Sequence, residues 1–148
     1  MDEIDRRLVT ELVGDGRCSY QELGRLVHLS ANSVADRVRR LRRSGVVSGF
    51  HAELGLAAVG RTLLALSDTK LHPEVDRIGF ERELAEVPQV LAATHTTGEY
   101  DYQIRLACRD TEELESVVDR LRALGVREIH SRIVLSEVTF RGTGLLAT

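Results

Sequence analysis

One segment, "SYQELGRLVHLSANSVADRVRRLRRSG" (19–45), constrains the fold most strongly, because it contains two capped amphipathic helices around a very short break. "SYQE" forms a capping box, in which Ser19 is the cap and Glu22 is the third helical residue. In the break "HLS", His28 tolerates a left-handed backbone and Ser30 caps the next helix. Two short helices joined by a three-residue turn are typical of a helix-turn-helix unit.

A further amphipathic helix is predicted ahead of this pair. Asp2 can cap it, and Asp5 falls in its first turn, where an acidic side chain is favourable. Ile4, Leu8 and Leu12 recur at helical spacing, and "GDGR" ends the helix. The first 45 residues therefore predict three short helices.

The third of these helices is strongly basic in a chain whose formal net charge is −3. Five of the seven residues from 37 to 43 are arginine. At 100° per residue, Val34, Val38 and Leu41 form the buried face, so the arginines lie outward or beside this face. Such arginines can neutralise DNA phosphates and contact guanine edges. A solvated helix surface is the simpler alternative, but the capped helix and turn before it favour a recognition helix for double-stranded DNA.

Recognition helices contact bases mainly through their N-terminal part. Two groups of candidate DNA-binding residues follow, and the capping Ser30 is a further DNA-binding candidate. The candidates for base edges are Asn32, Ser33, Asp36, Arg37 and Arg40, and those for phosphates are Arg39, Arg42 and Arg43.

The remainder of the chain alternates strands and helices in the order β-α-β-β-α-β, which is a ferredoxin-like unit. A strand with β-branched and aromatic residues is also expected just after the basic helix. The sequence predicts strands over 46–54, 62–70, 90–97, 102–109 and 126–140, and helices over 73–87, beginning with Pro73, and 110–124.

Charge and apolar patterning support two modules with different partners. Residues 1–55 have a net charge of +1, whereas residues 56–148 have −4. Both helices of the second module must cover one sheet face, yet Leu63 to Leu66 and "IVL" (133–135) place apolar residues on both faces. An uncovered apolar face predicts a twofold homodimer, which also suits two recognition helices on two DNA half-sites.

Three stretches together resemble the Lrp/AsnC family, the feast/famine regulators. They are "IDRRLVTELVGDGRCSYQELGRLVHLSANSVADRVRRLRRSGVVSGFHAEL", "HTTGEYDYQIRLACRD" and "GVREIHSRIVLSEV". The resemblance implies a transcriptional regulator of α+β class, with a winged-type helix-turn-helix and a ferredoxin-like βαββαβ ligand and oligomerisation domain. It implies dimers, often octamers of four dimers, and an amino acid or related effector bound between ligand domains. The expected domains are 1–50, a linker strand and hinge over 51–61, and 62–148.

The resemblance also suggests effector-binding residues. In the turn of "TTGEYD", Gly98 can present backbone N–H groups to a carboxylate, and Asp101 can accept an ammonium group. Asp101 can equally be a carboxylate that stabilises the turn. Hydroxyl contacts would come from Thr97 and Tyr100. On the last strand, Ile129 and Ser131 stand where the family often has two threonines, so the usual contact is altered here.

Two other functions remain open at this point. A sirohaem-decarboxylase-like enzyme has the same architecture but no need for a basic recognition helix, and an architectural DNA-binding protein needs no effector. No cofactor or metal is expected, because His95 and His130 lack a third ligand. The unpaired spacing of Cys18 and Cys108, the charged start and the absence of a long apolar run predict a cytoplasmic protein without membrane association.

Overall fold

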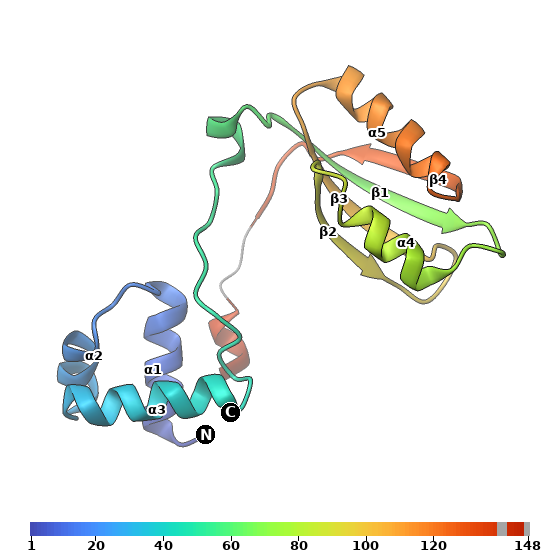
Figure 1. Cartoon of the computed structure of the whole chain (residues 1–148). Coiled ribbons are helices and arrows are strands. Elements are labelled where there is room, and N and C mark those ends of the chain that lie inside the picture. Colours follow the sequence, from blue (N-terminus) through green and yellow to red (C-terminus); the bar gives the residue numbers. More distant parts are fainter. Residues whose placement is uncertain (139–141, 147–148) are drawn as a thin grey trace. The chain divides into compact units, whose positions relative to one another are not determined.

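The computed structural model of the chain describes residues 1–138 and 142–146, and these form two compact units (Figure 1). The first unit comprises residues 1–53 together with the C-terminal end of the chain from residue 138 onward. The second unit spans Leu54–Glu137. The α+β class predicted from the sequence is confirmed.

The first unit contains the three predicted helices, α1 (Glu3–Gly14), α2 (Tyr20–Val27) and α3 (Ala31–Arg43). Their predicted caps are confirmed: Asp2 and Ser19 each form a reciprocal capping box, and the side chain of Ser30 accepts a hydrogen bond from the backbone of α3. The helices enclose a small apolar core. Its buried members are Leu8, Leu12, Leu23, Val27, Val34 and Val38.

The turn between α2 and α3 packs closely against α2. His28 has the left-handed backbone that the sequence predicts, with φ of 56°. The N–H of Leu29 donates to the carbonyl oxygen of Gly24 at 2.9 Å, and a Cβ on Gly24 would lie only 2.5 Å from the carbonyl oxygen of Leu29. Glycine at this position therefore makes room for the turn that sets the angle between the two helices.

The strand predicted over 46–54 is wrong. Within the first unit no described segment pairs with it, and β-branched residues alone do not create a strand without a neighbouring strand to bond. The segment instead lies beside α1. There Val46 and Phe50 line a small cavity of about 190 Å³ together with Val9 and Leu12 of α1. A 3-10 helix, η1 (Leu56–Val59), follows it.

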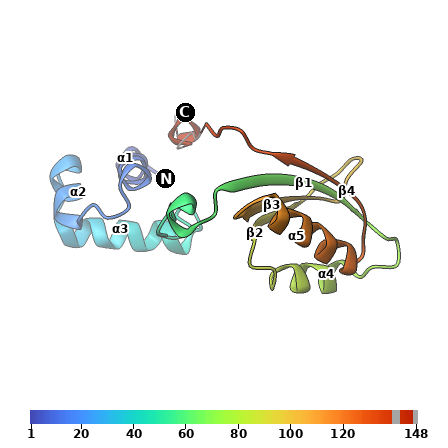
Figure 2. The same cartoon turned by 90° about the horizontal axis from the view of Figure 1, so that it is seen from above.

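The second unit is a four-stranded antiparallel sheet with the strand order β2-β3-β1-β4. Figure 2 shows α4 and α5 on the same face of this sheet. The predicted order β-α-β-β-α-β is therefore confirmed. The elements are β1 (Leu63–Leu71), α4 (Arg77–Leu84), β2 (Val90–His95), β3 (Tyr102–Cys108), α5 (Thr111–Ala123) and β4 (Val126–Ile133).

The core of this unit lies between the sheet and its two helices. Alternate residues of the central strands point toward the helices, as the alternation in β3 predicts. The buried members are Ala65, Phe80, Leu84, Val87, Tyr102, Ile104, Leu106, Cys108, Val117, Leu121 and Val126. The opposite face is left to Leu64, Leu66 and a set of polar and charged side chains on the same strands.

Two predicted boundaries are corrected. Pro73 does not begin a helix, because α4 starts at Arg77 and its cap is Asp76, which accepts a hydrogen bond from the N–H of Gly79 at 2.8 Å. The last strand ends at Ile133 rather than 140, since only the N–H of Val134, which donates to the carbonyl oxygen of Leu64, continues the contact with β1; residues 139 and 140 lie outside the described residues. A short 3-10 helix, η2 (Thr143–Leu146), completes the described chain.

A buried carboxylate joins the beginning of the second unit to its last helix. Both oxygens of Glu113 accept hydrogen bonds from Arg61, at 2.7 and 2.6 Å, and Gln89 and the N–H of Arg109 add two more. The Glu113 side chain is 9% exposed. These contacts, chiefly those from Arg61, lower the pKa of Glu113 from 4.5 to about 2.

This carboxylate predicts a specific loss of stability in acid. A lowered pKa contributes stability above pH 4.5 that is lost as the pH falls toward about 2, because the folded unit must then release its favourable hydrogen bonds. Glu113→Gln should flatten the fall in the free energy of unfolding across this range, measured by urea titration followed by circular dichroism. The matched control is Glu112→Gln at the exposed neighbouring position, and equal pH profiles for the two variants would contradict the assignment.

Candidate DNA interface and effector site

The basic helix α3 presents one apolar and one charged face. Val34, Val38 and Leu41 are buried, as predicted, and no arginine lies in the core. Four of the five arginines are exposed, and Arg37 is half-buried. An open groove of about 710 Å³ runs along this face. It is lined by Asp36, Arg37, Arg39, Arg40, Arg42, Arg43, Val47 and Ser48.

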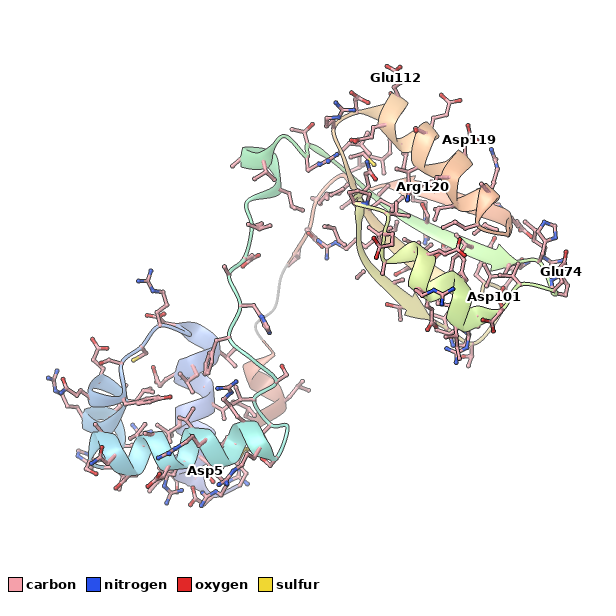
Figure 3. The ribbon with its side chains drawn as sticks, in the orientation of Figure 1. Asp5, Glu74, Asp101, Glu112, Asp119 and Arg120 are labelled. Carbon is pink, nitrogen blue, oxygen red and sulfur yellow. The ribbon has the colours of Figure 1, made fainter. Side chains whose placement is uncertain are left out.

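Two of these arginines bind a buried carboxylate of α1. Asp5 is 3% exposed and lies where α3 passes across the start of α1 (Figure 3). Nη1 of Arg37 donates to Oδ1 of Asp5 at 2.8 Å and to Oδ2 of Asp2 at 2.6 Å. Nη2 of Arg40 is 3.2 and 3.1 Å from the two oxygens of Asp5. The cap of α1 is thus also the counter-charge of α3.

These contacts keep the cluster ionised. Burial raises the pKa of Asp5, but hydrogen bonds from Arg37 and from the N–H of Asp2 outweigh it, so the pKa is lower than usual. The hydrogen bond from Arg37 likewise lowers the pKa of Asp2. The same bonds raise the pKa of Arg37, so the cluster holds two negative and two positive charges, including Arg40, at neutral pH.

The cluster gives Arg37 contacts that the sequence did not predict. The sequence nominates it for base edges, whereas the structure holds it against Asp2 and Asp5, with a side chain that is only 23% exposed. Sequence reasoning missed this because the partners are more than thirty residues apart. A signal was present: Asp5 falls on the same stripe of α1 as the buried Leu8 and Leu12, where a carboxylate needs a partner.

The remaining candidates on α3 differ in whether their side chains form ion pairs or hydrogen bonds. Arg39 forms an ion pair with Asp36 one turn before it on the same helix. The hydroxyl groups of Ser30 and Ser33 contact each other at 2.9 Å, and Asn32 is exposed beside them. Within residues 1–138 and 142–146, the side chains of the last candidates make no ion pair or hydrogen bond. These are Arg42 and Arg43.

The candidate effector residues of the β2–β3 turn do not share one environment. Gly98 has a φ of 113° and is exposed, as is Thr97. The ring of Tyr100 lies 5.6 Å from that of His130, and Lys70 lies above the Tyr100 ring at 5.0 Å. Tyr100 therefore lies at the sheet face that no helix covers, since His130 belongs to that face.

Asp101 and the two β4 candidates lie elsewhere. Oδ2 of Asp101 accepts the N–H of Leu71 at 2.8 Å, so this carboxylate does stabilise the turn region. Ile129 packs against the apolar core, and Oγ of Ser131 is 2.7 Å from Oγ of Ser67. These β4 side chains lie on the helix-covered face, opposite Tyr100, so the six predicted residues do not form one cluster.

A pocket of about 340 Å³ lies beside Asp101 at one end of the sheet. Only Asp101 among the predicted effector residues lines it. The other lining residues are Leu71, His72, Pro73, Val75, Arg77, His95, Tyr102 and Arg127. Arg127, which sequence reasoning missed, makes no side-chain ion pair or hydrogen bond with any part of the chain that the structure describes. An anionic and a cationic group therefore face one pocket.

Tyr102 and His95 connect this pocket to a second, more apolar one. The second pocket measures about 500 Å³ and lies between α4 and β2. Tyr102 donates to Oε1 of Glu81 at 2.6 Å, and burial, with this hydrogen bond, raises the pKa of Tyr102 to about 12. Its hydroxyl is therefore a fixed neutral donor. The other lining residues are Leu84, Ala85, Val90, Leu91 and Ala93.

The two histidines considered for a metal are far from one another in the sheet. His95 belongs to β2 and His130 to β4, which are the two edge strands. Across the described ranges, no three or more His, Cys, Asp and Glu side chains gather in a way that could hold a metal ion. Likewise, none of the described helices has the length and apolar character needed to cross a membrane.

Both units match sequence profiles of one family. The AsnC-type helix-turn-helix domain matches residues 1–42, and the Lrp/AsnC ligand binding domain matches residues 66–143. The HTH-type transcriptional regulator FL11 of Pyrococcus horikoshii is 31% identical over 140 residues, covering 91% of this chain and 89% of that protein. The HTH-type transcriptional regulator LrpA of Mycobacterium tuberculosis is 34% identical over 137 residues, covering 92% and 91%.

Solved structures agree with these sequence matches. The leucine response regulatory protein LrpA of Mycobacterium tuberculosis has a TM-score of 0.81 and 32% identity, with 95% of this chain and 97% of that chain covered. A transcriptional regulator of Neisseria meningitidis, solved as a complex with L-Met, has a TM-score of 0.87 and 28% identity, with 95% and 93% covered. The resemblance noted from the sequence is thereby confirmed: this chain belongs to the Lrp/AsnC family of helix-turn-helix transcriptional regulators.

Proposed function

We propose that this regulator binds specific sequences of double-stranded DNA through α3. The observation that carries the proposal is the exposed basic face of a helix that follows a capped helix and a tight turn. Asn32 and Asp36, toward the N-terminal end of this face, and Arg40, in the last turn, are assigned to base edges. Arg42 and Arg43, exposed at its C-terminal end, are assigned to phosphates together with Arg39. Arg37 is left out, because it is bound to α1.

Two substitutions on α3 test this division of roles. Selection from random duplexes first supplies a preferred site. Arg40→Ala should then reduce the preference for that site over random DNA by about 1–3 kcal/mol, because a base contact is lost. Arg43→Ala should weaken all duplexes alike and lower the salt slope by about one phosphate contact.

The matched control is Arg82→Ala, an exposed arginine of α4. It should bind like the unmodified chain, since α4 is assigned no DNA contact. Unchanged affinity and salt slope in both α3 variants would show that these arginines only solvate the helix.

We propose further that an amino acid binds the pocket beside Asp101. Oδ1 of Asp101 has no protein partner among the described residues and can accept an α-ammonium group, while Arg127 can donate to an α-carboxylate. The adjoining apolar pocket next to Tyr102 suits an aliphatic side chain. The structural relative solved with L-Met supports an amino acid as the class of effector.

Thermal unfolding with each of the twenty amino acids tests the effector proposal. A bound ligand raises the midpoint according to its concentration over its Kd, so one or a few amino acids should shift it. Arg127→Gln should abolish the shift, whereas Arg122→Gln, at an exposed position of α5, should retain it. If no amino acid changes the midpoint or the DNA affinity, an effector-independent architectural role replaces this proposal.

The sheet face that no helix covers is proposed as the homodimer interface. Leu64 and Leu66 lie on it, with charges of both signs around them, including the ion pair between Asp68 and Arg132. A face that carries both signs can be complementary to itself under a twofold axis. Two copies would also supply two recognition helices for two half-sites.

A charge placed at the centre of this face should dissociate the dimer. Leu66→Asp should convert the chain to a monomer at micromolar concentration, because an unpaired carboxylate would be buried between two sheets. Sedimentation velocity measures the change. Ile78→Asp, on α4 and already 68% exposed, should leave the mass unchanged; if Leu66→Asp also leaves the mass unchanged, the face is not the interface.

We also propose that the chain has no catalytic activity of its own. Its relatives are named as transcriptional regulators, and the basic helix that an enzyme of this architecture would not need is intact.

A further inference from the structure

The charge of α3 is smaller than its arginines suggest. Arg39 is paired with Asp36, and two further arginines are paired with carboxylates at the start of α1. Five arginines thus meet three aspartates, which leaves a net of two positive charges. Asp2 and Asp5, at the start of α1, precede the helix-turn-helix in the chain and are not part of the outward face of α3. Their effect on DNA binding therefore acts through the arginines that they hold.

We propose that Asp5 is a positioning residue for DNA recognition, which holds Arg37 away from DNA phosphates and restrains Arg40 from behind. This inference rests on the proposed DNA-binding function of α3. Its consequence is that each recognition helix binds non-specific DNA through fewer phosphate contacts than its number of arginines would allow.

Arg37 is bound strongly to α1, because it has two carboxylate partners and one of them is buried. The guanidinium group spans Asp2 and Asp5 at 2.6 and 2.8 Å. Moving it to a phosphate would deprive a carboxylate that is 4% exposed of its closest charged partner. Weakening such a buried pair is unfavourable, because the buried carboxylate would keep only the longer contact to Arg40 and the N–H of Asp2. A phosphate in water does not offset that cost.

The hold on Arg40 differs in kind. Its side chain is 57% exposed, and only Nη2 contacts Asp5, at 3.1 and 3.2 Å. Nε and Nη1 have no partner within the described part of the chain. One end of the planar group is thus fixed while the other donors face outward. A guanidinium held in this way loses less conformational entropy on contacting a base edge.

The arrangement favours specific over non-specific binding. Affinity for arbitrary DNA comes mainly from counterions that are released when arginine or lysine neutralises phosphates. Arg37, which stays bound to α1, contributes nothing to that affinity. Arg40, which also contacts Asp5, is restrained to one position. Specificity depends on the ratio of the two affinities, so weaker non-specific binding raises it.

Salt dependence of binding to random-sequence duplex DNA measures this directly with the full chain. The unmodified chain gives a slope of log affinity against log salt that counts its phosphate contacts. Asp5→Asn keeps the shape of the side chain but removes the charge that binds Arg40 and one of the two charges that bind Arg37. The slope should steepen by about 0.9 for each arginine that reaches a phosphate: about 0.9 per recognition helix when Arg40 alone is released, and about 1.8 when Arg37 also leaves Asp2.

Two further variants make the result unambiguous. Glu3→Gln changes the net charge equally on the same turn of α1, but Glu3 pairs with no arginine in the described residues, so its slope should stay close to the unmodified value. Arg37→Gln should also leave the slope unchanged, whereas Arg42→Gln should lower it by about 0.9. This second comparison remains valid even when Asp5→Asn fails to fold, as judged by circular dichroism.

The proposal is overturned if folded Asp5→Asn has the slope of Glu3→Gln. It is equally overturned if Arg37→Gln lowers the slope as much as Arg42→Gln does, because Arg37 would then contact phosphate in the unmodified chain. Failure of the underlying function looks different: the unmodified chain would show no salt-dependent binding to any duplex.

Discussion

The carboxylate of Asp5 is the interaction on which the DNA-binding unit depends. It is buried, it completes the cap of α1, and it binds two arginines of α3, so the first and third helices are joined at a charged contact as well as through their apolar core. A buried ion pair adds little net stability, but it is costly to break. Its main effect is therefore to fix how α3 is rotated and which of its arginines remain available.

The second unit also depends on one carboxylate that accepts several hydrogen bonds. Glu113 gathers Arg61, Gln89 and a backbone N–H, which fixes the point where the chain enters the sheet. With two helices on one face of that sheet, the other face carries no helix, and the pocket beside Asp101 lies at the sheet's end. DNA contact, effector contact and self-association are thus assigned to separate surfaces of one chain.

Local signals in the sequence predicted most of the fold. Capping residues such as Ser19 and Ser30, the left-handed His28 and the alternation in β3 depend on neighbours a few residues away, and the structure has all of them. One failure involved distant partners and the other did not. Residues 46–54 have strand composition but no strand beside them; the start of α4 was misplaced for a local reason, because Asp76 rather than Pro73 caps the helix at Arg77.

The candidate sites divide in the same way. Helical periodicity placed the outward face of α3, but it did not reveal that Asp5 holds Arg37. For the effector, Tyr100 of the turn and the β4 residues Ile129 and Ser131 lie on opposite faces of the sheet, and Arg127 was missed because only the fold brings it beside Asp101. Charge pairing across the fold, rather than local pattern, decides which polar residues are free to bind.

Nuclear magnetic resonance of the arginine side chains, recorded while duplex DNA is added, tests the central claim most directly. The Nε signals of Arg40, Arg42 and Arg43 should shift on binding, while the signal of Arg37 should stay in place. A shift of the Arg37 signal together with the other three, or unchanged α3 signals beside shifted arginines of the second unit, would be the opposite result.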